Sequence, residues 1–132
     1  MTLLSLLLLY LVFRLKQLMC DFILQNSWMA LRKGDPSTEG WRALFSHTVI
    51  HACGTLIVTL LFAPSLFWLA GVDFIIHSVI DRVKGYLTLR YHWTYSDRNY
   101  WWAFGIDQEA HNITHLVYII LILMARGGLA SV

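Results

Sequence analysis

Four long apolar runs dominate the sequence and decide what it can fold into. They cover approximately residues 3–31, 41–62, 65–87 and 104–125. A helix needs roughly 20 apolar residues to cross a bilayer. Of the 132 residues, 58% are hydrophobic and 14% are charged, whereas soluble domains carry about 25% charged residues. The sequence therefore predicts an all-α fold, a four-helix transmembrane bundle that forms one integral-membrane domain over residues 1–132.

Basic residues gather around two of the three connections between these runs. Connections 32–42 and 84–104 hold six of the ten Lys and Arg residues, and the positive-inside rule places such connections in the cytoplasm. We therefore expect a multi-pass protein of the cell (inner) membrane with both termini outside. The apolar N-terminal run lacks the basic start and the cleavage site of a signal peptide, so it is interpreted as the first span.

Each run carries polar residues spaced four positions apart, which share one face of a helix. These groups are Asp21 and Gln25; His47 and His51; Asp73, His77 and Asp81; and Asp107, His111 and His115. Lipid cannot satisfy such side chains, so the stripes are expected to face the bundle interior. Counting turns from the cytoplasmic ends places the groups of neighbouring helices at matching depths. The sequence thus predicts a polar cluster in the cytoplasmic half of the membrane.

Imidazole nitrogens and carboxylate oxygens are the usual ligands of zinc and of non-haem iron or manganese. We predict a divalent metal site, with zinc favoured over iron or manganese, whose ligands are His47, His51, His77, Asp81 and His111. The candidates for a general base are Asp107 and Asp21, and the side chains expected beside the ligands are Gln25, His115 and Lys84. Because a bound ion acidifies water, this set favours a metal-dependent hydrolase acting on a lipid or amphiphilic substrate from the cytoplasmic side.

Two other interpretations of the same residues stay open. Relays of His and Asp mark transporters, so the first alternative is a small oligomeric transporter, channel or proton-relay subunit. Buried polar groups also hold helices together, so the second is a non-catalytic membrane interaction module with a structural polar core. Lipid-facing surface is available for a homo-oligomer. The net charge of +2, without a basic stripe, predicts no nucleic-acid partner.

Short segments of the chain also recur. "DFILQ" at 21–25 matches "DFIIH" at 73–77, and each is followed by a lysine–glycine pair, in "RKG" and "VKG". "HTVIH" at 47–51 matches "HNITH" at 111–115. This pattern is compatible with two tandem helical hairpins related by an axis along the membrane normal, and with chance.

The series "DFILQ", "HTVIH", "HSVID" and "DQEAH" resembles a family of small bacterial and phage membrane proteins classed as a domain of unknown function. The resemblance runs from about Gln17 to about Leu121 and covers the motifs D-F-x-x-Q, H-x-x-x-H, H-x-x-x-D and D-Q-x-x-H. The matching residues are Asp21, Phe22, Gln25, His47, His51, His77, Asp81, Asp107, Gln108 and His111. Gln108 therefore joins the side chains expected beside the ligands.

This chain departs from that family pattern at Gln17, where the family often has His, and Asp73 and His115 lie outside the pattern. The family implies no activity. The arrangement is also similar, more loosely, to membrane-embedded metal-dependent hydrolases, which use His and Asp from several helices.

Overall fold

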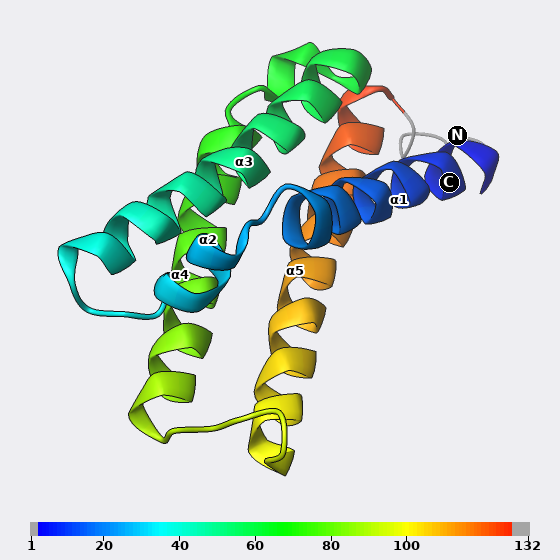
Figure 1. Ribbon diagram of the computed structural model, residues 1–132. Coiled ribbons are helices and arrows are strands. Elements are labelled where there is room, and N and C mark those ends of the chain that lie inside the picture. Colours follow the sequence, from blue (N-terminus) through cyan, green and yellow to red (C-terminus); the bar gives the residue numbers. More distant parts are fainter. Residues whose placement is uncertain (1–2, 128–132) are drawn as a thin grey trace.

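The computed structural model describes residues 3–127 and is built from helices joined by short connections (Figure 1). Its main helices are α1 (Leu3–Leu18), α2 (Ser27–Arg32), α3 (Thr38–Phe62), α4 (Leu69–Arg90) and α5 (Arg98–Ala125). A π-helical turn, η1 (Met19–Ile23), extends α1, and a 3-10 turn, η2 (Pro64–Leu66), precedes α4. No strand occurs among the described residues, which confirms the predicted all-α class. The two termini, which were predicted to lie outside the cell, fall outside the described residues.

The prediction of one helix over 3–31 is wrong, because the chain breaks after η1. Asn26 has an extended backbone, and its side chain accepts a hydrogen bond from the Met29 N–H as the N-cap of α2. Such a cap satisfies a backbone donor that the first turn of a helix leaves free. The break turns the chain, so that α2 packs beside α3 instead of continuing α1 (Figure 1).

The predicted boundaries of the last two helices also shift. α4 covers Leu69–Arg90 and α5 begins at Arg98, so the ranges 65–87 and 104–125 are corrected. The connection shrinks to residues 91–97, because Asp97 accepts hydrogen bonds from the Thr94 N–H and hydroxyl and closes a tight turn. Tyr100, Trp101 and Trp102 therefore belong to the first turns of α5.

Helix α4 lies between α3 and α5 and packs against both, while α1 crosses α5 obliquely (Figure 1). An apolar core fills one end of this assembly, with Phe13, Val58, Leu69, Tyr118 and Ile122 among its buried members. The polar residues of the predicted stripes follow directly below it. The bundle thus has an apolar core at one end and a polar cluster in the middle.

Two segments are long and apolar enough to cross a membrane, Leu3–Ile23 and Thr38–Phe62. Helices α4 and α5, of 22 and 28 residues, have sufficient length, but charged residues interrupt them. A bundle with four membrane spans therefore stays a prediction.

The two glycines of the repeated lysine–glycine pairs contact each other. A Cβ atom added to Gly85 would lie 2.6 Å from the Cα of Gly34, and one added to Gly34 would lie 2.5 Å from the carbonyl carbon of Gly85. Contact between equivalent positions is what an approximate two-fold axis would produce. The break after η1 has no counterpart in α4, so the two halves differ in structure.

Candidate metal centre

The five predicted ligands lie together in one buried cluster contributed by α3, α4 and α5. Their exposed fractions are between 0% and 1%, and the residues are His47, His51, His77, Asp81 and His111. The ring of His77 lies at the centre, with centroid distances of 4.0 Å to both His51 and His111. The i, i+4 spacing thus placed these side chains on the faces that meet inside the protein.

The cluster divides into three groups of possible metal ligands. They are Asp21, His47 and His51; Asp73, His77 and His115; and Asp81, Asp107 and His111. Within each group one ligand atom per residue lies within 4.8 Å of the others. The predicted ligand set is therefore spread over three neighbouring triads, and the two candidate bases, Asp21 and Asp107, are each members of one.

In the first triad the carboxylate of Asp21 is already engaged. Its Oδ1 lies 2.9 Å from His51 Nε2, and its Oδ2 accepts hydrogen bonds from the side-chain amides of Gln17 and Gln108. Gln17, which stands where the resemblance led us to expect His, thus serves as a hydrogen-bond donor to this carboxylate.

In the second triad two cations engage Asp73 and His115, while Asp73 Oδ1 and both ring nitrogens of His77 have no hydrogen-bond partner among the described residues. Lys16 Nζ donates to Asp73 Oδ2 at 2.9 Å, and the Thr55 hydroxyl donates to the same oxygen at 2.7 Å. The two ring nitrogens of His115 lie 2.9 Å from Arg14 Nη2 and 3.3 Å from Lys16 Nζ. A divalent ion here would face repulsion from Lys16 and Arg14.

The third triad has more buried ligand atoms without hydrogen-bond partners than either of the other two. Asp81 Oδ2, Asp107 Oδ1 and both ring nitrogens of His111 are buried and have no hydrogen-bond partner among the described residues. The nearest opposite groups are His47 Nε2, 3.3 Å from Asp81 Oδ2, and Asp107 Oδ1 itself, 3.6 Å from His111 Nε2. Buried polar atoms without partners cost about 1–3 kcal/mol each. This triad has four such atoms and the second triad has three, and the cation that contacts this triad is Lys33, whereas both Lys16 and Arg14 contact the second.

Lys33 is a functional candidate that the sequence analysis did not find. Its side chain enters the cluster from the connection before α3, and Nζ donates to Asp81 Oδ1 at 2.6 Å and to Gln25 Oε1 at 2.9 Å. Arg82 holds this connection in place by donating to the backbone carbonyl of Asp35 at 2.6 Å. The sequence shows Lys33 as one of several basic residues in a polar turn, and only the tertiary structure shows that it is buried.

The other side chains expected beside the ligands take different positions. Gln108 Nε2 donates to carboxylate oxygens of both Asp21 and Asp107, at 3.2 Å each. Lys84 lines a small cavity of about 50 Å³ together with Gln25, Lys33, Asp107 and others. Asp81 forms its ion pair with Lys33. Lys84 therefore lies beside the cluster and does not pair with Asp81.

The model of a family described as "Protein of unknown function (DUF3307)" matches residues 6–130. The chain belongs to this family. No curated protein and no solved structure matches it.

Membership in the DUF3307 family confirms the predicted link to a family without assigned function, and the match covers every triad. In this member, Asp81 and Asp107 would provide two oxygen ligands and His111 one nitrogen ligand from adjacent helices. That donor set suits zinc, iron or manganese. The chemistry of the free donor atoms therefore fits a divalent ion at the third triad.

Proposed function

We propose that this protein is a membrane-embedded, metal-dependent hydrolase that acts on a lipid or another amphiphile from the cytoplasmic side. The observation that supports this proposal most is the third triad, where three side chains keep buried donor atoms without hydrogen-bond partners. Asp107 of this triad also lines the small polar cavity, which would give water and a substrate headgroup access to the ion.

In this proposal Asp81, Asp107 and His111 hold the metal, with zinc favoured over iron or manganese. When bound, the ion would lower the pKa of coordinated water towards about 7 and so provide a nucleophile at neutral pH. Lys33 fixes Asp81 through one carboxylate oxygen and leaves the other free. Asp21 is then the candidate general base, and Gln108 orients it relative to Asp107.

The membrane location and the orientation belong to the same proposal. Two helices with the length and composition of membrane spans support it, and so do many exposed apolar side chains, such as Leu11, Leu15, Ile57 and Leu61. Lys33 in the connection 33–37 and Arg90 and Arg98 at the helix ends that flank the connection 91–97 favour a cytoplasmic location for those segments.

Elemental analysis of the purified protein in detergent tests the metal site. The wild type and Glu109→Gln are expected to contain stoichiometric metal, whereas Asp107→Asn and His111→Gln are expected to lose most of it. Glu109→Gln is a matched control, because it makes the same change from carboxylate to amide two positions away at an exposed site of α5. Equal metal content in all four proteins, or none in the wild type, would contradict the proposal.

A lipid assay tests the reaction itself. Zinc-loaded protein in vesicles of phosphatidylethanolamine and phosphatidylglycerol is expected to release hydrolysis products detectable by mass spectrometry, and chelation or Asp107→Asn should abolish them. Products that persist in the chelated protein would rule out a metal-dependent mechanism. A metal-loaded protein that releases none of these products would remove the support for hydrolysis of these lipids.

One observation favours a second function, a proton relay. The rings of His47, His51, His77 and His111 follow one another with centroid distances of 4.7, 4.0 and 4.0 Å, and such a row of imidazoles could pass protons. Proton flux into proteoliposomes separates the two functions. Flux that survives chelation and disappears in His77→Ala would favour the relay over the hydrolase.

A further inference from the structure

An apolar groove lies between α4 and α5, next to the candidate metal centre. Its volume is about 530 Å³, and its walls include Ile80, Val83, Leu87, Trp102, Ala103 and Ile106. This volume falls in the range of roughly 300–1,000 Å³ that is usual for ligand sites. The groove could therefore hold an extended apolar chain.

The groove and the small polar cavity meet at two residues. Lys84 and Asp107 line both of them, and the polar cavity adds Gln25, Lys33 and Gln108. Its volume of about 50 Å³ accommodates a few water-sized groups. An amphiphile with its chain in the groove would thus place its polar end at Lys84 and Asp107.

The charges at this junction favour an anionic headgroup. Lys33 is paired with Asp81, whereas Lys84 has no carboxylate within ion-pair distance among the described residues; its Nζ lies 5.5 Å from the ring centre of Phe104. An ion bound by Asp81 and Asp107 would neutralise those two carboxylates. Lys84 would then be an unmatched cation at the end of an apolar groove.

We infer that the groove between α4 and α5 binds an acyl chain of a phospholipid and that Lys84 contacts its phosphate. As the substrate site, this inference rests on the proposed hydrolase function; as a lipid-binding site, it can be tested without hydrolysis. The phosphate would lie beside Asp107, within reach of the metal that Asp107 is proposed to bind.

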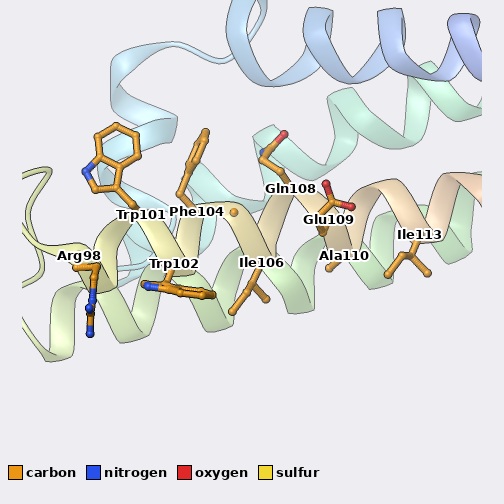
Figure 2. Close-up of a pocket in the computed structure, with 10 residues that line it drawn as sticks. Arg98, Trp101, Trp102, Phe104, Ile106, Gln108, Glu109, Ala110 and Ile113 are labelled. Carbon is orange, nitrogen blue, oxygen red and sulfur yellow. The ribbon is translucent and has the colours of Figure 1, made fainter.

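A second surface hollow offers a comparison. It measures about 700 Å³, and its ten lining residues all belong to α5 (Figure 2). Figure 2 shows Phe104 and Gln108 pointing to one side of this helix and Trp102 and Ile106 to the other. A surface formed by one helix cannot enclose a ligand, so Ile113, which lies there and not in the groove, provides a control position.

Native mass spectrometry of the protein in dodecyl maltoside tests the site with two lipids that differ in headgroup. We expect dioleoyl phosphatidic acid to bind more tightly than dioleoyl phosphatidylcholine, and Lys84→Gln to weaken phosphatidic acid binding about tenfold, the effect of one lost charge-assisted contact of about 1.4 kcal/mol. Arg90→Gln, which also replaces a cation of α4 by an amide but lies outside both cavities, should preserve the affinity.

A second pair of variants tests the groove. Ala103→Trp, which fills it, should weaken binding of both lipids, whereas Ile113→Trp should leave both unchanged. Equal binding of the two lipids by the wild type, or equal losses in Lys84→Gln and Arg90→Gln, would overturn the inference. Selective lipid binding by a protein that contains no metal would uphold this lipid site and contradict the hydrolase. Stoichiometric metal without lipid selectivity would contradict this lipid site and leave the metal site of the proposed hydrolase supported.

Discussion

The ammonium group of Lys33 lies 2.6 Å from the carboxylate of Asp81, and both side chains are at most 8% exposed. Lys33 comes from a short connection and Asp81 from the middle of α4, so this contact fixes the connection against the polar cluster. The two carboxylate oxygens differ in their contacts, because Oδ1 accepts a hydrogen bond from Lys33 while Oδ2 accepts none and lies 3.3 Å from His47 Nε2.

Removal of one member of this pair should destabilise the protein strongly. We expect Lys33→Met to lower the free energy of unfolding by about 3–5 kcal/mol, since it leaves a buried carboxylate unpaired. The double variant Lys33→Met, Asp81→Leu should recover most of that loss. Thermal unfolding in detergent provides the measurement, and Arg32→Met, which removes a neighbouring but exposed ion pair, should change little. Equal effects of the two Met variants would show that Lys33 is not buried.

The contact between Gly34 and Gly85 leads to a second prediction. Gly85→Ala should lower stability by about 1–3 kcal/mol, because its Cβ would overlap the backbone of Gly34. Gly71→Ala is the control in the same helix, where a Cβ meets nothing within 4 Å. It should raise stability by up to roughly 1 kcal/mol through helix propensity. A neutral Gly85→Ala would mean that the two segments lie further apart.

The sequence predicted the polar cluster because it depends on helix geometry alone. Residues such as His47 and His51 share a face in any helix, and an apolar protein has to turn that face inwards. The burial of Lys16 and Lys33 could not be predicted in this way. A lysine near the end of an apolar run usually extends its ammonium to water, and here its position depends on Asp73 and Asp81, more than 40 residues away.

The break in the first predicted helix had a signal in the sequence. Asn26 followed by Ser27 is a typical helix start, but the surrounding apolar residues suggested one uninterrupted span. The division of the ligands into three triads had no such signal, because it depends on how far each helix slides along its neighbours.

Arg82 should be sensitive to a change that keeps its charge. Its guanidinium lies 4.2 Å from the ring centre of Trp41 and donates to the carbonyl of Asp35. Lysine cannot stack and donate in the same way, so Arg82→Lys should lower stability by about 1–2 kcal/mol. Arg42→Lys changes an exposed partner of Glu39 and should be nearly neutral. Thermal unfolding of both variants checks this, and equal melting temperatures would contradict the proposed anchor.

We expect the carboxyl group of Asp35, which lies outside the apolar helices, to make the stability of the protein depend on pH. The backbone N–H of Ser37 donates to its carboxylate and lowers the pKa of Asp35 below its ordinary value. A carboxyl group whose folded-state pKa is lowered stabilises the protein above the unfolded-state pKa, and this contribution disappears as the pH falls through the folded-state value. Asp35→Asn should therefore melt below the wild type near pH 7 and approach it below about pH 4. A melting difference that does not change with pH would contradict this, and Glu39→Gln is the control.

The number of membrane spans can be tested by labelling single cysteines from either side of sealed vesicles, in a Cys20→Ala, Cys53→Ala background. With four spans, Glu39→Cys and Ser96→Cys should react with an impermeant maleimide from the cytoplasmic side. Ser65→Cys, in the exposed connection before α4, should react from the opposite side. Labelling of Ser96→Cys and Ser65→Cys from the same side would mean that α4 does not cross the membrane.

The ion pair between Lys16 and Asp73 joins positions 57 residues apart, and this separation affects how the chain is made. While the ribosome has released only α1, the ammonium group of Lys16 has no counterion, and such a charge is costly inside a bilayer. In the proposed membrane arrangement, helix α1 would therefore reach its final depth only once α4 has emerged. Biogenesis of this protein would then not proceed span by span, and a nascent chain stalled before α4 would leave an unstable first segment for proteolytic quality control to remove.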